Sequence, residues 1–247
     1  MTKKIAMIIP VRLASTRLPN KPLADILGKT MIRRVYEKAI ESGVGEVFIA
    51  CDGDEIAAEA KKIGANFVIT DPNLPSGTDR IYAALKAVGK DFDAVINLQG
   101  DLPNIDSSVI KSAANALFES DCDIATVASK IKDTQEITNP NVVKIAIAFN
   151  DENCGRALYF SRCAIPYSKE NAQDYYHHIG IYAYKTKALQ KFVALKPSLL
   201  EKRESLEQLR ALENDMKIVV KLVDAHPLSV DTQEDLEAVI RQISGQI

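Results

Sequence analysis

Short apolar runs alternate with amphipathic stretches along the first half of the chain. Five runs have the length and composition of buried strands: 5–10, 46–50, 66–69, 94–98 and 124–127. Between them, apolar residues recur at helical spacing and predict helices over 31–42, 54–63, 81–88 and 106–118. This alternation of strands and helices predicts an α/β fold with a mostly parallel sheet flanked by helices.

The pattern changes after Asn139. Two apolar runs, 142–148 and 157–160, are joined by the polar turn NDENCG and predict antiparallel strands. The remaining pattern predicts strands over 179–184 and 218–223, and helices over 189–195, 200–212 and 232–243. We expect a single domain over 1–247 with a β-rich arm inserted at about 139–178. Because an isolated hairpin is poorly stable, we expect this arm to support dimerisation.

Composition narrows the possible partners and compartment. The 247 residues are 47% hydrophobic and 26% charged, with a net charge of -2, which is typical of a globular protein and argues against a nucleic-acid or membrane-surface binder. No apolar run approaches the roughly 20 residues that span a bilayer, and the first residues lack a signal-peptide pattern. The four cysteines show no CxxC spacing. We therefore expect them to be reduced thiols, as is usual in cytosolic proteins. We expect a cytoplasmic protein with neither nucleic-acid nor membrane partners.

A stiff cationic loop follows the first predicted strand. In the sequence PVRLASTRLPNKPL, backbone amides around Ala14 and Ser15 can cup phosphate oxygens, and Arg12 and Lys21 can supply charge. In an open parallel sheet, ligands bind beyond the carboxyl ends of the strands, where this loop begins. The loop matches neither the Walker A pattern nor GxGxxG. The alternative is a solvated basic loop.

A second loop, TDPNLPSGTDR, precedes the helix predicted at 81–88. Its polar groups could hydrogen-bond the edge of a planar base. They are the backbone groups of Ser76 and Gly77 and, one helical turn later, the guanidinium of Arg80. The alternative is that SGT only caps the helix.

Two carboxylates also follow predicted strands. The strand in VINLQGDLP delivers Gln99 and Asp101 to the edge of the sheet, and Asp231 stands before the last predicted helix. Mg²⁺ is commonly held by one or two carboxylates together with phosphate oxygens and water. Asp101 and Asp231 together therefore predict a split magnesium site, although Asp231 alone fits a helix N-cap equally well.

Eight segments follow one another in this order across nearly the whole chain: PVRLASTRLPNKPL, SGTDR, NLQGDLP, NPNVVK, ALYFSRCAIPY, HHIGIYAY, LEQLRALE and VDTQEDL. In these segments the chain resembles the 3-deoxy-manno-octulosonate (Kdo) cytidylyltransferase family, the CMP-Kdo synthetases of lipopolysaccharide assembly. Other sugar cytidylyltransferases open similarly, whereas YFSR, HHIGIY and LEQLR are more specific. The resemblance implies a nucleotidyltransferase-type fold, a homodimer, and Mg²⁺-dependent transfer of CMP from CTP to Kdo with release of pyrophosphate.

Matching motifs also imply roles for individual residues. The CTP phosphates would contact Arg12 and Lys21, supported by Ala14 and Ser15. Cytosine would be held by Ser76, Gly77 and Arg80, with Gln99 beside the sugar or the nucleotide. Asp101 and Asp231 would bind Mg²⁺ and, with Arg12 and Lys21, form the catalytic set. The acid sugar would meet Arg162, His178, Tyr182, Glu207 and Gln208.

Two positions depart from the family pattern and leave the acid sugar open. Leu102 stands where many members carry glutamate, and His177 stands where the family often has a basic residue. The alternatives are a related acid sugar such as 8-amino-Kdo, or a nucleotide-sugar-binding protein without catalysis.

Overall fold

The computed structural model describes residues 3–15, 17–169 and 174–245. The chain forms two compact units, one of residues 1–111 and 227–247 and one of residues 112–226. The boundary falls within helix α4 (Ser107–Glu119). Thr16 of the cationic loop and residues 170–173 of the expected arm lie outside the described residues. The expected organisation, a single domain with an inserted arm, stays a prediction.

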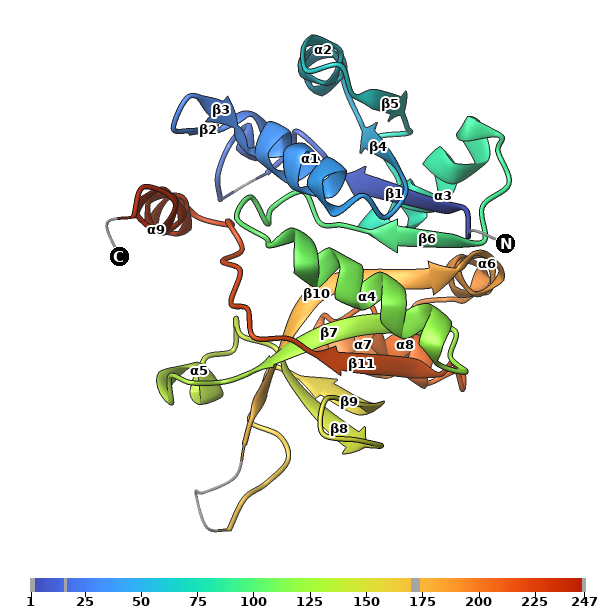
Figure 1. Cartoon of the computed structure of the whole chain (residues 1–247), viewed down its shortest axis with the longest axis vertical. Helices are drawn as coiled ribbons and strands as arrows, with labels where there is room; N and C mark the ends of the chain where they lie inside the picture. Colours follow the sequence, from blue (N-terminus) through green and yellow to red (C-terminus); the bar gives the residue numbers. More distant parts are fainter. Residues whose placement is uncertain (1–2, 16, 170–173, 246–247) are drawn as a thin grey trace. The chain divides into compact units, whose positions relative to one another are not determined.

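The first unit is built on a parallel sheet. Its strands are β1 (Ile5–Pro10), β4 (Glu46–Cys51), β5 (Asn66–Ile69) and β6 (Ala94–Asn97), in the order β5-β4-β1-β6 (Figure 1). Every described pairing among them is parallel, as the alternating pattern predicted. All six residues of β1 are buried, because strands on both sides and helices exclude water from it.

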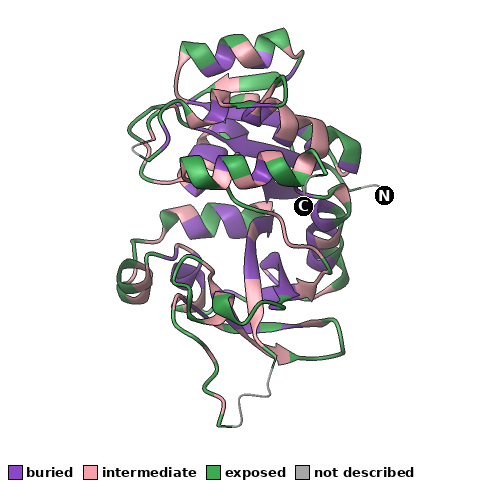
Figure 2. Ribbon diagram, turned by 90° about the vertical axis from the view of Figure 1, so that its left-hand side faces the viewer, coloured by how far each residue is buried: buried purple, intermediate pink, exposed green. Residues whose placement is uncertain are grey.

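Capping side chains mark the starts of three helices described in this unit. The helices of the unit are α1 (Met31–Ser42), α2 (Asp54–Lys62), α3 (Gly77–Val88) and α9 (Gln233–Ile243), with a 3₁₀ turn, η1 (Lys21–Leu23), and a small hairpin, β2 (Asp25–Ile26) and β3 (Lys29–Thr30). Thr30 caps α1, and Thr232 and Asp235 form the capping box of α9. Figure 2 shows buried strands beside helices that carry exposed residues on one side.

The strand order reverses between β1 and β6. The chain passes from β1 to β4 and β5 on one side, and then to β6 on the other side of β1. The carboxyl ends of β1 and β6 therefore border the point at which open α/β sheets bind ligands. The loops that leave these two ends carry Arg12 and Lys21, and Gln99 and Asp101.

The second unit contains a mixed sheet. Its strands are β7 (Ile124–Lys130), β8 (Lys144–Phe149), β9 (Cys154–Ser161), β10 (Tyr176–Lys185) and β11 (Ile218–Leu222), in the order β10-β7-β11-β9-β8. β7 and β11 are parallel, and the other described pairings in this unit are antiparallel. The β8–β9 hairpin confirms the predicted antiparallel excursion. A single bridge, His177 to Lys144, joins the first strand of the order to the last.

The predicted helix over 200–212 is wrong. The segment forms two short helices, α7 (Leu199–Glu204) and α8 (Leu209–Leu212), and α5 (Gln135–Thr138) and α6 (Thr186–Ala194) complete the helices described in this unit. Ser205 ends α7 in the left-handed region, at φ 53°, and its N–H donates to Glu201 O. The leucines keep helical spacing across this break, so periodicity alone did not reveal it.

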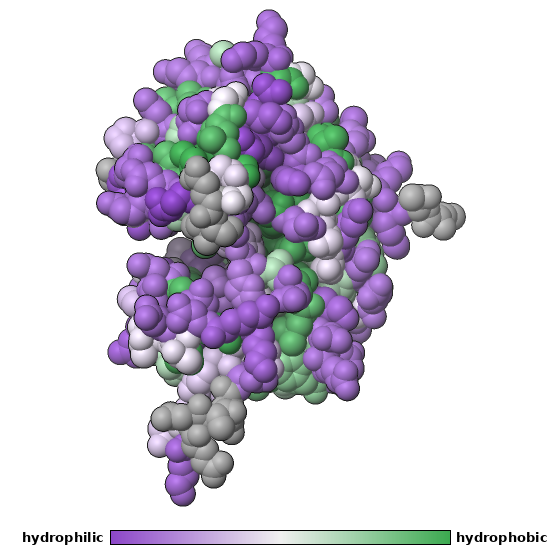
Figure 3. All heavy atoms as spheres, turned by 60° about the vertical axis from the view of Figure 1, so that its left-hand side comes forward, coloured by the Kyte–Doolittle hydropathy of each residue, from purple (hydrophilic) through white to green (hydrophobic). Residues whose placement is uncertain are grey.

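The surface seen in Figure 3 is mainly hydrophilic, with hydrophobic residues in small groups. In the part of the chain that the structure describes, no helix combines the length and apolar character needed to cross a membrane. The four cysteines are unpaired.

Candidate functional site

A cavity of about 330 Å³ opens at the carboxyl ends of β1 and β6. All of its lining residues belong to the first unit. It brings together most of the residues predicted for the nucleotide and the metal: Arg12, Lys21, Ser76, Gly77, Arg80, Gln99, Asp101 and Asp231. Ala14 and Ser15 lie on the loop between Arg12 and Lys21 but are not part of the lining among the described residues. The volume suits a small organic ligand.

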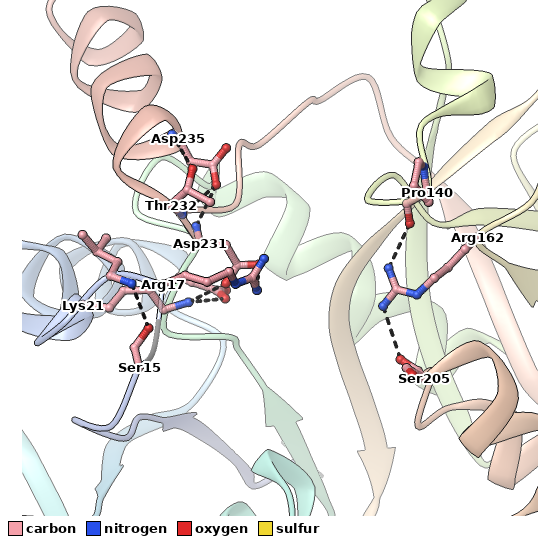
Figure 4. A network of polar contacts seen from close by, with 11 residues as sticks. Ser15, Arg17, Lys21, Pro140, Arg162, Ser205, Asp231, Thr232 and Asp235 are labelled. Carbon is pink, nitrogen blue, oxygen red and sulfur yellow. Dashed lines mark hydrogen bonds and ion pairs between the residues drawn. The ribbon is translucent and has the colours of Figure 1, made fainter.

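The ammonium group of Lys21 lies between two carboxylates. Its Nζ is 3.1 Å from Asp101 Oδ2 and 3.0 Å from Asp231 Oδ1. Arg17 also reaches Asp231, with 3.0 Å between Nη2 and Oδ2, and Figure 4 shows both cationic side chains pointing toward it. The Val230 N–H donates to Asp101 O at 3.0 Å, which fixes the segment before α9 beside the loop after β6.

These contacts keep Lys21 and Asp231 charged. Burial alone lowers the pKa of Lys21, but the charge of Asp101 and the hydrogen bond to Asp231 outweigh it, so this pKa lies above its usual 10.5. Burial raises the pKa of Asp231, but the hydrogen bond from Lys21 and the charges of Lys21 and Arg17 leave it below the usual 3.8. The cavity therefore offers anionic oxygens together with a cation near neutral pH.

Arg80 reaches the cavity from α3 and is held by a buried hydroxyl. It is only 3% exposed, and its Nη1 donates to Thr70 Oγ1 at 2.5 Å. Thr70 in turn donates to Cys51 O at 2.9 Å, so the ends of β4 and β5 fix the guanidinium. Nearby, Gln99 Nε2 donates to Asn97 Oδ1 at 3.0 Å.

Gly100 permits the close approach of the loop after β6 to β1. A Cβ atom at this position would lie 2.4 Å from Val11 Cγ1 and 3.2 Å from Pro10 O. Any larger residue would push the loop that carries Asp101 away from the end of β1.

Arg162 follows β9 in the second unit and is tied to main-chain carbonyls. Its Nε donates to Glu204 O at 2.8 Å, its Nη1 to Pro140 O at 2.9 Å and its Nη2 to Ser205 O at 3.4 Å (Figure 4). These bonds use three of its five N–H groups. Lys144 fixes the backbone there as well, because its buried Nζ donates to Arg162 O at 2.5 Å.

His178 and Tyr182 lie together on β10. Their ring centroids are 5.3 Å apart, and His178 Nε2 lies 3.0 Å from Thr126 Oγ1 on β7. Burial raises the pKa of Tyr182 well above its usual 10.0, and the charges of Tyr184 and Glu207 act in the same direction. Glu207 therefore lies near this pair. Gln208 is buried at the start of α8.

The structure shows the surroundings of Leu102 and His177, the two positions that depart from the family pattern. Leu102 is 5% exposed and packs in the core, so an apolar residue suits its position. Burial, together with the charges of His226 and Lys144, lowers the pKa of His177 to about 4. His177 is therefore neutral at neutral pH and brings no positive charge to β10.

Known proteins resemble this chain over nearly its whole length. The cytidylyltransferase family model matches residues 6–218. The 3-deoxy-manno-octulosonate cytidylyltransferase of Brucella anthropi is 50% identical over 241 residues, covering 96% of this chain and 95% of the relative. That of Parvibaculum lavamentivorans is 49% identical over 233 residues, covering 94% and 89%. The chain belongs to the 3-deoxy-manno-octulosonate cytidylyltransferase family. The sequence resemblance is thus confirmed at the level of the family.

Solved structures match the fold over nearly the full length. A structure of CMP:2-keto-3-deoxy-manno-octonic acid synthetase complexed with CTP has a TM-score of 0.91 and 35% identity, covering 99% of this chain and 100% of that one. A 4-diphosphocytidyl-2C-methyl-D-erythritol synthase from Anaerococcus prevotii has a TM-score of 0.66 at 16% identity, covering 99% and 100%, which shows a shared fold only. The mixed α/β fold predicted from the sequence is that of the family.

Two residues of the first unit were not assigned from the sequence. Thr70 orients Arg80, and the carboxylate of Asp52 accepts the N–H of Leu13 at 3.0 Å and so anchors the cationic loop. Arg17, a further cation of this loop, pairs with Asp231. Asp52 directly follows β4, so the rule that singled out Asp101, a carboxylate at the carboxyl end of a parallel strand, would also have found it. No local signal marks Thr70.

Proposed function

We propose that this chain transfers CMP from CTP to the anomeric hydroxyl of Kdo, giving CMP-Kdo and pyrophosphate for lipopolysaccharide biosynthesis. The observation that carries the proposal is the cavity at β1 and β6, where Lys21 lies between Asp101 and Asp231 in a chain of this family. The relatives that bear the matching name are about half identical over nearly their whole length.

The cavity has the groups that CTP requires. Arg12 and Lys21 would bind the triphosphate, with the backbone around Ala14 and Ser15 in support. Ser76, Gly77 and the fixed guanidinium of Arg80 would hold cytosine, and Gln99 would contact the nucleotide or the sugar. The buried position of Arg80 supports this assignment, because a desolvated, immobile donor discriminates well between bases.

The same cavity fits Mg²⁺. Asp101 and Asp231 already converge on one cationic group, the ammonium of Lys21, so they supply two oxygen donors directed at one position. Phosphate oxygens and water would complete the coordination. When bound, the ion would neutralise charge on the triphosphate. The described residues contain no cluster of three or more His, Cys, Asp or Glu side chains that could hold a metal alone, which agrees with a site that the nucleotide completes.

Kdo would bind to residues of the second unit. Its carboxylate would take the remaining N–H groups of Arg162, whose guanidinium is already oriented by carbonyls. Its hydroxyls would meet the mixed donors and acceptors predicted for them, which are His178, Tyr182, Glu207 and Gln208.

The reaction is an in-line displacement at phosphorus. The anomeric oxygen of Kdo would attack the α-phosphorus, forming the new O–P bond as the bond to pyrophosphate breaks. The proton of the attacking hydroxyl would pass to solvent water. Arg12 and Lys21 would stabilise the charge that builds on the leaving pyrophosphate. Positioning of the two substrates would supply much of the remaining acceleration.

We further propose a cytoplasmic homodimer in which the arm at about 139–178 forms the interface. Two exposed apolar side chains on the β8–β9 hairpin support an interface there: Phe149 is 41% and Leu158 is 50% exposed. A light-scattering mass near twice 27.1 kDa would agree, and a monomer at micromolar concentration would contradict it.

Thr70→Val is expected to raise the KM for CTP about tenfold, because Arg80 loses the hydroxyl that orients it. The KM for Kdo should not change. Thr70→Ser keeps the hydroxyl and should restore the KM for CTP, which steady-state kinetics with each substrate varied in turn can measure. Equal KM values for CTP in the valine variant and the wild type would show that Thr70 plays no part in base recognition.

Arg162→Lys is expected to raise the KM for Kdo by about ten- to a hundredfold while leaving the KM for CTP unchanged, because lysine keeps the charge but loses the planar fork. Urea unfolding should accompany the kinetics, since Arg162 also holds three carbonyls and its loss is expected to cost about 1–3 kcal/mol of stability. An unchanged KM for Kdo would reject the carboxylate contact.

The proposed function is tested by identifying the product. With CTP, Kdo and Mg²⁺, ³¹P NMR should show a phosphodiester and pyrophosphate in equal amounts, and mass spectrometry should give CMP-Kdo. Addition of EDTA should stop the reaction. If 8-amino-Kdo reacts far better than Kdo, the mechanism stands and the sugar assignment is wrong. If neither sugar reacts, the proposed function is wrong and the alternative of a nucleotide-sugar-binding protein without catalysis is favoured.

A further inference from the structure

A buried threonine of β7 contacts the ring of His178. Thr126 is fully buried, and its Oγ1 lies 2.8 Å from Ile181 O, 3.4 Å from Ile179 O and 3.0 Å from His178 Nε2. These three partners surround one hydroxyl because the β7–β10 register shifts between Ile179 and Tyr182. The irregularity turns two carbonyls of β10 toward the same side chain.

The arrangement decides which ring nitrogen of His178 carries the proton. A threonine hydroxyl has a single hydrogen, and carbonyl oxygens only accept. The close contact with Ile181 O takes that hydrogen, so the Thr126 oxygen faces Nε2 with a lone pair. The contact with His178 is a hydrogen bond only if Nε2–H is the donor. A bare Nε2 would compete with two carbonyls for the single proton of a fully buried hydroxyl.

The environment of the ring keeps it neutral. Burial lowers the pKa of His178 to about 3, and the neighbouring His177 acts in the same direction. Phe160 packs edge-on at 4.9 Å between centroids, and Tyr182 lies at 5.3 Å on the same strand. A neutral imidazole with hydrogen on Nε2 has a lone pair on Nδ1. In the described part of the chain, no group hydrogen-bonds Nδ1.

We propose that Thr126 is a positioning residue that holds His178 in the Nε2–H tautomer, so that Nδ1 is presented as a hydrogen-bond acceptor for a hydroxyl group of the acid sugar. The sugar contact rests on the proposed function, whereas the tautomer does not. An acceptor at Nδ1 would repel the sugar carboxylate and select a hydroxyl or ammonium donor. His178 would thus recognise a different part of the sugar from Arg162.

The tautomer is tested by long-range ¹H–¹⁵N NMR on protein labelled in its histidines. The chain has only three histidines, so His178 is assigned by comparison with His178→Gln. The wild type should show His178 as Nε2–H with a bare Nδ1 across the neutral pH range. A spectrum of the Nδ1–H tautomer, or of an imidazolium at pH 7, would overturn the proposal without any activity measurement.

The role of Thr126 is tested with a matched set of variants. Thr126→Val keeps the shape but removes the hydroxyl, and His178 should then lose its single tautomer. The KM for Kdo should rise about tenfold with the KM for CTP unchanged. Thr126→Ser should restore both the spectrum and the KM. Ser129→Ala is the control, since Ser129 is buried on the same strand and its hydroxyl has no partner among the described residues.

The outcomes separate the two proposals. A pure Nε2–H spectrum in Thr126→Val would show that Thr126 does not set the tautomer. An unchanged KM for Kdo in this variant would show that Nδ1 does not contact the sugar. If Thr126→Val does not fold, the wild-type spectrum and the serine variant still decide. If the wild type shows the Nε2–H tautomer but neither Kdo nor 8-amino-Kdo reacts, the proposed function fails and the sugar contact with it, while the tautomer stands.

Discussion

Asp101→Asn is expected to reduce kcat by about a thousandfold while changing the free energy of unfolding by no more than about 1 kcal/mol. Asparagine has nearly the same size as aspartate but carries no charge, so the cavity would lose one of its two carboxylates. Asp101 is partly exposed at the end of a strand and contributes little to the core. Pyrophosphate release measures the turnover, and urea unfolding measures the stability.

The matched control is Asp91→Asn. Asp91 is an exposed carboxylate on the approach to the same strand, β6, and it lies outside the cavity lining. Its replacement should leave both kcat and stability at wild-type values. Full turnover in Asp101→Asn would reject the assignment of Asp101 to the metal and to catalysis.

Lys21→Met is expected to have two opposite effects. The kcat/KM for CTP should fall by about a hundred- to a thousandfold, because the triphosphate loses a partly buried cation. In the absence of nucleotide, divalent ions should bind more tightly than to the wild type, because no ammonium lies between Asp101 and Asp231. Titration with Mn²⁺, followed by electron paramagnetic resonance, measures the second effect directly.

Lys21→Arg is the control for charge and should bind divalent ions as weakly as the wild type.

The stability lost in Lys21→Met should also depend on pH. The pKa of Asp231 is lowered in the folded protein, so the stability it contributes is present above its usual 3.8 and is lost as the pH falls through the lower folded value. The pKa of Lys21 is raised, so its contribution is complete below 10.5 and is lost as the pH rises through the higher folded value. The difference in stability between wild type and variant should therefore be greatest between these limits. Equal metal affinity in Lys21→Met and the wild type would contradict the account of this cation.

Much of the first unit could be predicted because its signals are local. Apolar runs such as Ile5–Pro10 marked the buried parallel strands, and Thr30 and Thr232 marked helix starts through their side-chain oxygens. The position of Asp101 and Asp231 at one edge of the sheet was also predictable, although 130 residues separate them, because loops after parallel strands meet at that edge.

The second unit was less predictable because its determinants are contacts between distant segments. The turn at Ser205 breaks a run of well-spaced leucines, and nothing in the local sequence marks its left-handed backbone. Arg162 was predicted as a ligand of the sugar, but its guanidinium also holds carbonyls of Pro140 and Glu204, which only the folded chain brings to it. The bond between Thr126 and His178 depends on a register shift in β10 that periodicity does not show.

The central claim is that this cavity carries out cytidylyl transfer to an acid sugar. The most direct measurement is pyrophosphate release with Mg²⁺ for each of the four ribonucleoside triphosphates, paired in turn with Kdo and with 8-amino-Kdo. The account predicts rapid release only with CTP and Kdo, and none without the sugar. Release with a different nucleotide, or no release with any pair, would contradict it.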